Sequence, residues 1–396
     1  MPYQTGRNVV VAYKANAGVY GAPATSGGGA TGFRPISGGM NLTKGVTESQ
    51  ENRRDGMRTR GRHSQRAVAG SYQAELSLET FDPLFEAAMR ATWTAPSAVT
   101  QASHGTLSVQ TDGFTGASGN FITGGIRVGD VVRPTSGVSV ANRINCQVIG
   151  VTASKITVAQ LLTAEAGPIA TWNISRPKRL LQPAIPVARD FSFAEYEVDI
   201  DQAERFDGVR VGGFSLEMRP DSLVNVTFNM VGQNGVALAT GNSPYFTNPV
   251  FTTSRPMHVV DASLRLGAEN ILDLTGFTLG FDTAAQPVSV AASNVTPDVF
   301  TNLSTVTSEI TALRGDLARV ADFLAETQLA LHLMCAVPGT TDFFSLAITN
   351  LTLGGVNKSA LGADGPRTQT MPLVIGIEEA GGAFDTTMIK ISTSAA

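Results

Sequence analysis

A pattern of one strand followed by one helix occurs twice in this chain, and it constrains the fold more than any other feature. In residues 68–79, small or apolar side chains alternate with polar ones, which is the period of a half-buried β-strand. Asp82 is the predicted N-cap of the helix that follows, and Pro83 is its first residue. The apolar positions of this helix have the spacing of a single helix face: Phe81, Leu84, Phe85 and Ala88.

The second copy occupies residues 305–324. The alternation recurs, Asp316 is the predicted N-cap, and four apolar residues again have helical spacing: Leu317, Val320, Ala321 and Leu324. The strands expected after each helix also match in order: 191–200, 209–218 and 223–232 in one half, and 329–335, 346–353 and 370–376 in the other. An internal duplication fixes the architecture, so we expect two copies of one β-rich unit.

An additional segment separates the first helix from the strand that should follow it. In the second copy the helix leads almost directly into a strand at Leu329, whereas in the first copy the matching strand begins only at Phe191. Residues 95–188 are therefore predicted to be an inserted module. Short strands expected at 105–109, 126–133, 146–151 and 155–158 indicate a small β-barrel or sandwich. The first unit then comprises residues 1–94 and 189–256, and the second comprises residues 257–396.

The composition argues against a disordered chain or one that coats nucleic acid. Of the 396 residues, 42% are hydrophobic and 16% are charged, and the formal net charge is −4. Such a chain buries substantial cores and lacks the basic excess of a phosphate-binding surface. Cys146 and Cys335 fall in different modules, so we expect neither a disulfide nor a metal site. No signal peptide or membrane-spanning run is found, which predicts a soluble protein that folds in a cytoplasm.

No arrangement of catalytic residues is found. The histidines share no motif and lie in separate segments: His63, His104, His258 and His332. A Gly-x-Gly-x-x-Gly sequence at residues 27–32 is followed by Arg34 and Pro35, so the helix that a dinucleotide site needs does not begin there. We therefore expect no enzymatic activity and no cofactor.

Several stretches resemble the tail tube (major tail) proteins of long, flexible-tailed bacteriophages. The stretches are RHSQRAVAGS at 62–71, ELSLETFDPLFEAA at 75–88, FAEY at 193–196, DQAERFDGVRVG at 201–212 and SNVTPDVF at 293–300. The likeness covers most of the chain outside the insertion. Within the insertion, GIRVGDVV at 125–132 resembles the small β-modules that such proteins carry on the outside of the tube.

The resemblance implies a mainly β fold of the α+β class, in which duplicated β-sandwich units each carry a flanking helix. It implies a structural protein that forms rings, which stack into a tube through which genomic DNA passes without sequence-specific binding. A tape measure protein and a tail terminator are the partners expected from the family. The protein would assemble in the host cytoplasm, reside in the virion tail and involve no membrane.

Two sets of side chains are predicted to act in assembly and DNA passage. Polar side chains of the repeated strands are expected to face the channel, because carboxylates and hydroxyls do not trap phosphates. They are Gln73, Glu75, Ser77, Glu79, Thr307, Glu309 and Thr311. Residues 47–66 are predicted to form a loop that pairs with acidic residues of a neighbouring subunit. Its arginines are Arg53, Arg54, Arg58, Arg60, Arg62 and Arg66.

The duplication also bears on ring size. If each chain supplies two units, a ring of six units closes with three chains, whereas a ring with one unit per chain would be a hexamer. Two other functions remain open from the sequence. One is a phage or secretion-system tube or sheath protein that conducts no DNA. The other is a carbohydrate-binding β-sandwich protein. The presence of only two tryptophans argues against it.

Overall fold

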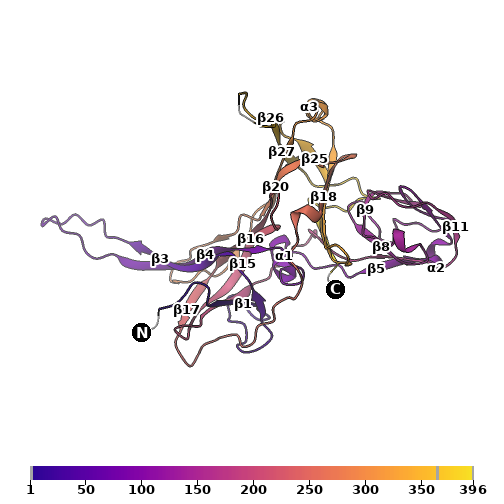
Figure 1. Cartoon of the computed structure of the whole chain (residues 1–396). Helices are drawn as coiled ribbons and strands as arrows, with labels where there is room; N and C mark the ends of the chain where they lie inside the picture. Colours follow the sequence, from indigo (N-terminus) through magenta and orange to yellow (C-terminus); the bar gives the residue numbers. More distant parts are fainter. Residues whose placement is uncertain (1–2, 363–364, 395–396) are drawn as a thin grey trace.

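The chain is built almost entirely of β-strands, and the computed structural model describes residues 3–362 and 365–394. Most strands join one 18-stranded sheet that forms the body, while the inserted segment forms a separate 8-stranded sheet beside it (Figure 1). The expected mainly β fold of the α+β class is confirmed. Short additional elements lie outside these two sheets: β21 (Gln286–Pro287), β22 (Val299–Phe300), η1 (Val140–Asn142) and η2 (Val259–Asp261).

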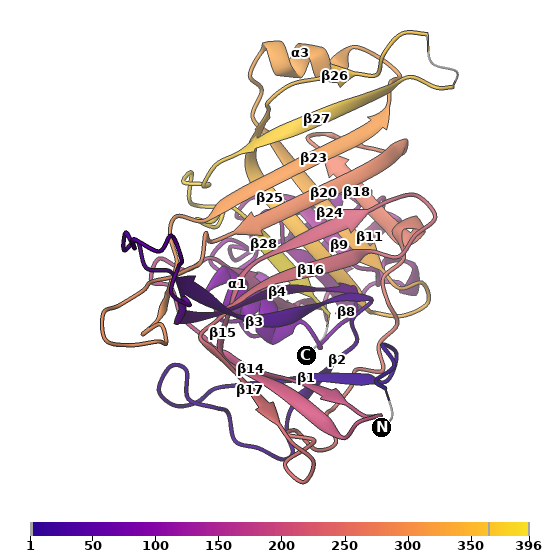
Figure 2. The ribbon, with the colours of Figure 1, turned by 90° about the vertical axis from the view of Figure 1, so that its left-hand side faces the viewer.

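One layer of the body is a continuous antiparallel sheet in the order β3-β4-β16-β15-β20-β23-β27 (Figure 2). Its strands are β3 (Ser37–Thr47), β4 (Arg62–Glu75), β16 (Asn225–Gly232), β15 (Gln202–Met218), β20 (Leu274–Asp282), β23 (Thr305–Leu313) and β27 (Thr368–Ile375). One face packs on the core and the other is open, because the strands alternate apolar and polar side chains as predicted.

The second layer covers the core face of this sheet in two parts. In the first half it contains β1 (Val9–Ala15), β2 (Thr31–Phe33), β14 (Phe191–Glu197), the first part of β15 and β17 (Asn234–Leu238). In the second half it contains β18 (Ala262–Leu266), β19 (Glu269–Asn270), β24 (Leu329–Ala336), β25 (Phe343–Leu353) and β28 (Lys390–Thr393). A single hydrophobic core lies between the layers and runs through both halves.

Each half uses the same order of elements and the same strand pairings. The pairs β1–β14, β14–β15, β15–β16, β16–β4 and β4–β3 of the first half recur as β18–β24, β24–β25, β25–β27, β27–β23 and β23–β20 of the second. β17 follows and pairs with β15, just as β28 follows and pairs with β25. The repeat that the alternating pattern indicated therefore extends to the arrangement of the whole unit.

The two halves are joined through β15 and β20. Gly213–Met218 pairs with Phe277–Asp282, so the sheet crosses from one half to the other without a break. Glycine is required at position 213, because a Cβ there would lie 2.2 Å from the carbonyl oxygen of Phe281. We call this contact the internal joint.

The helices α1 (Asp82–Met89) and α3 (Ala318–Leu324) follow corresponding strands but have different surroundings. α1 is buried, and its Phe85 ring centroid lies 5.0 Å from that of Phe214 and 5.7 Å from that of Phe344, which belongs to the other half. No residue of α3 is buried. The predicted N-caps are wrong: Phe81 and Leu317 occupy those positions. The Asp82 carboxylate instead accepts a hydrogen bond from Lys178 Nζ at 2.7 Å.

The inserted segment has a core of its own, which includes Phe114, Phe121, Ile156 and Trp172. Its sheet order is β11-β6-β7-β10-β9-β8-β12-β5. The strands are β5 (Ser97–Thr100), β6 (Leu107–Gln110), β7 (Gly113–Gly116), β8 (Val131–Ser136), β9 (Cys146–Val151), β10 (Lys155–Val158), β11 (Glu165–Ile169) and β12 (Asn173–Arg176), with the short α2 (Gln101–His104). The strand expected at 126–133 begins only at Val131, because residues 127–130 form a turn closed by the Asp130 carboxylate.

The segment that leaves the insertion does not run free to the next strand. Within it, β13 (Lys178–Leu181) pairs with β28 of the second half. The second layer of the second half is thereby extended by a strand that precedes β14 in sequence. The sequence signal for this strand is weak, because only Leu180 of its four residues is both apolar and fully buried.

Candidate assembly surface

Rows of polar side chains cross the open face of the sheet from one half to the other. Residues that pair directly across strands share a face, so the printed registers define each row. One row contains Glu75, Asn225, Glu217, Thr278, Glu309 and Pro372. The next contains Ser37, Gln73, Thr227, Ser215, Gly280 and Thr307, and a third contains Gly39, Ser71, Asn229, Gly213, Asp282 and Thr305. The polar faces of the two halves thus form one continuous surface.

The structure places most of the predicted channel residues on this surface. Gln73 and Glu75 are half-buried on β4, and Thr307 and Glu309 are exposed on β23. Thr311 is also on β23, where its hydroxyl lies 3.2 Å from that of Thr370. Whether this surface lines a channel stays a prediction.

Ser77 and Glu79 lie beyond the end of β4 instead of on it. The strand ends at Glu75, and Leu76 N–H donates to the Val224 carbonyl at 2.8 Å. Glu79 has a φ of 71°, which belongs to the turn that leads into α1. The alternation of residues 76–79 therefore continues past the strand because Leu76 and Leu78 are still buried beneath the turn.

The open face is acidic. The three rows contain Glu75, Glu217, Glu309 and Asp282 and no lysine or arginine. Arg219, just past the end of β15, pairs with Glu217 at 2.5 Å but is itself 75% exposed. A surface of this kind repels a polyanion or leaves it free to move.

The sheet ends in two unpaired strand edges. At one end, β3 pairs only with β4 among the residues that the structure describes. At the other end, β27 is covered by the last residues of β25 and by β26 (Asn357–Lys358), whose outer edge has no partner within residues 3–362 and 365–394. Exposed edges of this length carry main-chain groups that can pair with another chain.

A hairpin arm extends from the body on the side away from the inserted module (Figure 1). β3 and β4 form its base, and residues 48–61 form its tip. The predicted loop of residues 47–66 is too long, because Thr47 pairs with Arg62 and the ladder continues through Arg66. Arg62 and Arg66 therefore lie on β4, and Arg66 donates to Asn234 Oδ1 at 3.0 Å.

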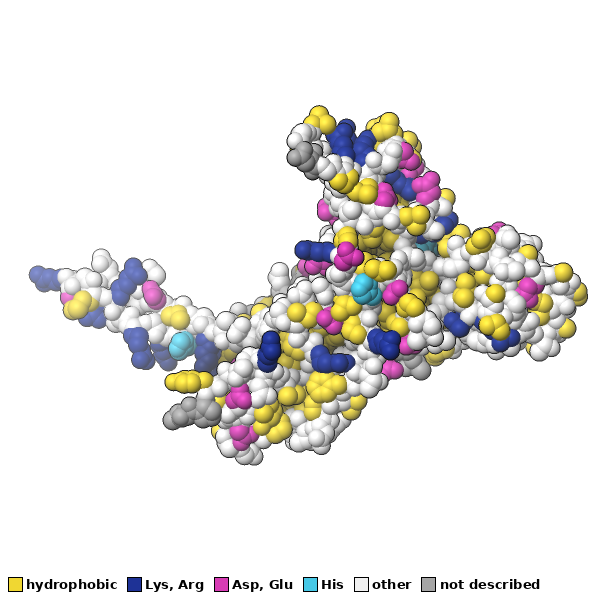
Figure 3. Space-filling view, in the orientation of Figure 1, with side chains coloured by type: hydrophobic (Ala, Val, Ile, Leu, Met, Phe, Trp, Pro, Cys, Tyr) yellow, Lys and Arg dark blue, Asp and Glu magenta, His cyan; other side chains and the backbone are white. Residues whose placement is uncertain are grey.

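The other predicted arginines lie in the tip of the arm, where cationic side chains gather (Figure 3). Arg53 pairs with Asp55 at 2.7 Å, and Arg58 pairs with Glu48 at 3.3 Å. Arg54 and Arg60 are exposed and have no ion pair in the described part of the chain. The tip therefore presents more positive charge than its own carboxylates neutralise.

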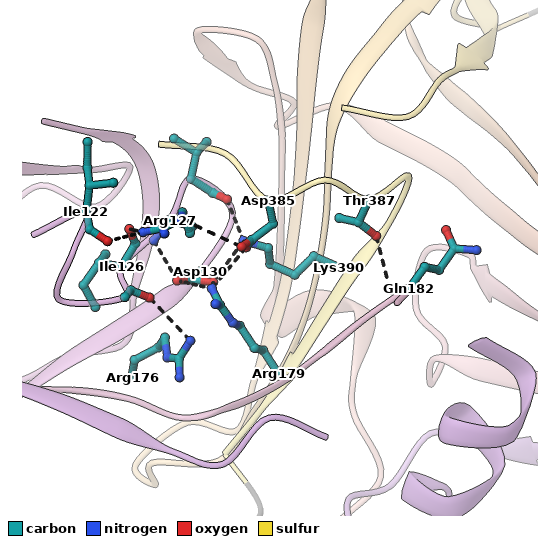
Figure 4. A network of polar contacts seen from close by, with 12 residues as sticks. Ile122, Ile126, Arg127, Asp130, Arg176, Arg179, Gln182, Asp385, Thr387 and Lys390 are labelled. Atoms are coloured by element: carbon teal, nitrogen blue, oxygen red, sulfur yellow. Dashed lines mark hydrogen bonds and ion pairs between the residues drawn. The ribbon is translucent and has the colours of Figure 1, made fainter. Parts of the chain in front are cut away.

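A buried ionic network fixes the inserted module to the body (Figure 4). Lys390 on β28 reaches Asp130 of the module at 3.0 Å and Asp385 at 2.5 Å, and its Nζ donates to the Val128 carbonyl at 2.8 Å. Arg179 on β13 contacts the same two carboxylates at 3.0 and 3.1 Å. Burial alone would raise the pKa of Asp130, but Lys390 and Arg179 hold it below its usual range. No pattern in the sequence indicates these contacts, because their partners are far apart in the chain.

The surroundings of His332 indicate a structural role. His332 on β24 is buried, and burial, with Lys390 and Arg265 nearby, lowers its pKa to about 4. No group of three or more His, Cys, Asp or Glu residues in the described ranges is placed to hold a metal ion.

The comparison with protein families decides the identity. A family model described as phage tail tube protein matches residues 6–374, which is nearly the whole chain. The chain belongs to the phage tail tube protein family. The resemblance seen in the sequence is thus confirmed, and the protein is a structural component of the virion tail whose family assembles into multimeric tubes. No curated protein matches this tail tube protein.

Two other observations describe this tail tube protein. None of the helices within its described residues has the length and hydrophobicity needed to cross a membrane. The sequence also contains a matching Gly-Gly pair in each half, Gly212-Gly213 on β15 and Gly354-Gly355 after β25, each flanked by apolar residues. Strand and helix periodicity does not reveal this pair, although it marks the same place in both units.

The ionic network predicts a large effect of one substitution. Lys390→Met should destabilise the protein by about 3–5 kcal/mol, because it leaves the two buried carboxylates with Arg179 and only a 3.9 Å contact from Arg127 to Asp385. Lys155→Met removes a module ion pair with Asp112 that is largely exposed, and it should cost at most about 1 kcal/mol. Urea unfolding of both variants provides the measurement. Equal effects of the two substitutions would contradict the role assigned to the network.

Proposed function

We propose that copies of this chain close head to tail into rings, and that the rings stack into a tube that conducts DNA into the host. The observation that carries the proposal is the continuous sheet, which has an acidic open face. At each end of the sheet, the outer edge of the last strand has no strand partner among the described residues. Edge-to-edge addition of such sheets closes a barrel that leaves no free edge. The open face then becomes the wall of the channel. A tape measure protein and a tail terminator are the expected assembly partners, with assembly in the host cytoplasm.

The inserted module fits the outer wall of this tube. It lies behind the sheet when the open face is viewed directly (Figure 2). An insertion of this size between a helix and a strand is tolerated where the chain faces solvent. The module adds bulk on the side away from the channel, so it does not obstruct passage.

The repeat within the chain predicts a ring of three chains with a pseudo-sixfold channel, and not a ring of six. Each chain contributes two equivalent sheet units but only one inserted module. An averaged cross-section from electron microscopy of assembled tubes should therefore show three outer projections per ring. Six equivalent projections would contradict the three-chain ring, and a wild-type protein that never forms rings or tubes would contradict the proposed function itself.

The acidic face predicts a charge-dependent defect in DNA passage. Particles with Glu75→Arg and Glu309→Arg should eject DNA at least about tenfold more slowly, because arginines hold phosphates through counterion release. The defect should weaken as salt is raised, since screening reduces this attraction. Particles with Glu75→Gln and Glu309→Gln provide the control and should eject nearly normally. Normal ejection by the arginine particles would refute the assignment of this face to the channel.

The arm predicts a defect in polymerisation without a defect in folding. We propose that its tip arginines pair with carboxylates of an adjacent copy, where partial burial strengthens such contacts. Replacement of residues 50–59 by a short Gly-Ser turn should leave the melting temperature nearly unchanged and abolish long tubes in negative-stain images. A control that replaces only Met57, which is 64% exposed at the tip, with Ser should polymerise normally. Normal tubes from the shortened arm would overturn this role.

A further inference from the structure

The second half of the chain leaves apolar surface exposed that the first half buries. In α1, Leu84 and Phe85 are 0% and 2% exposed. In α3, which occupies the same place in the second unit, Leu324 is 75% exposed, and Leu317 at its N-cap is 65% exposed. Both helices carry apolar residues at the spacing of one face, so the difference lies in what covers them.

Part of the cover of α1 comes from across the internal joint, in addition to Phe214 and Phe228 of its own half. Phe85 of α1 contacts Phe344 on β25 of the other half. At the same joint, β15 pairs with β20. One unit therefore presents a strand edge and a helix together, and the next unit pairs with the edge and adds an aromatic contact to the helix. At the end of the second unit the same two features, the edge formed by residues 354–359 and the apolar side of α3, have no cover in the described part of the chain.

We propose that a second copy of the chain occupies this end: its β3 pairs with residues 355–359, and its first unit covers α3. The proposal rests on the proposed ring and adds the surface and register of the contact between copies. The unpaired edge of β3 fits this role because β3 corresponds to β20, the strand that completes the internal joint.

The repeated Gly-Gly pair sets the register of the contact. Gly212-Gly213 on β15 corresponds to Gly354-Gly355, so Ser215 corresponds to Asn357. Ser215 pairs with Gly280 of β20. Asn357 pairs with Thr370, which pairs with Thr311, just as Ser215 pairs with Thr227, which pairs with Gln73. Thr311 therefore corresponds to Gln73, and Thr307 corresponds to Ala69. Gly280 pairs with Thr307, so the equivalent position of the first unit is Asn41, which pairs with Ala69. Asn357 of one copy should therefore lie opposite Asn41 of the next, and both are exposed in the single chain.

A cysteine cross-link tests the register. The variant with Asn357→Cys and Asn41→Cys should form disulfides between copies in assembled tubes under mild oxidation, and gels without reductant should show a ladder that ends at the closed ring. The native cysteines Cys146 and Cys335 are buried, so they contribute little background. The control combines Asn357→Cys with Leu161→Cys, an exposed position of the module. Tubes in which both pairs cross-link to the same low extent would overturn the contact while leaving the proposed tube intact.

A surface substitution tests the helix. Leu324→Asp should reduce tube formation at least tenfold, because it places a carboxylate in the covered apolar contact. Its monomer should keep the melting temperature of the wild type, since Leu324 is exposed in the single chain. Leu161→Asp, at an equally exposed leucine of the module, should assemble normally. Normal assembly of Leu324→Asp would overturn the role of α3. Failure of the wild type to assemble would instead count against the proposed function.

Discussion

Main-chain hydrogen bonding at the edges of a sheet is the constraint on which this structure depends. Every strand edge exposes amide and carbonyl groups that must bond to water or to another strand. Inside the chain the constraint is met at the internal joint, where β15 of one unit pairs with β20 of the next. The close approach at Gly213 is a consequence of that pairing, and the aromatic contact between Phe85 and Phe344 connects the same two halves. The outer ends of the same sheet have no strand partner among the described residues of one chain.

The sequence predicted the repeated unit well because its signal is local. Period-two alternation in β4 and β23 and helical spacing after each strand come directly from which side chains must be buried. The position of the insertion followed from a mismatch between the two copies. The resemblance to tail tube proteins rested on stretches within the same repeated parts, and it added the expectation of rings that no residue pattern supplied.

Features that depend on contacts between distant residues were not predictable in this way. The N-cap of α1 was misassigned because the carboxylate of Asp82 pairs with Lys178, whose position depends on the path of the inserted segment. β13 was not predicted because a four-residue strand that begins with two charged residues has no period to detect. The paired base of the arm is longer than the sequence predicts, because a polar two-stranded ladder gives no hydrophobic alternation. Among the assembly residues, the face that Gln73, Glu75 and Glu309 occupy follows from alternation, but their alignment in rows depends on strand register.

A protein made of two fused units has one contact between units inside the chain and another between chains. Its two units can therefore differ in their surface structure, which identical copies of a single unit cannot. When identical copies of one unit form a ring, any change to the unit appears at every position around it. Here the two halves are separate stretches of sequence, so a bulky module has been added after α1 and not after α3. Around the proposed ring, decorated and bare positions alternate. The bare positions leave room between modules, so the modules can enlarge or change their surface without colliding with one another.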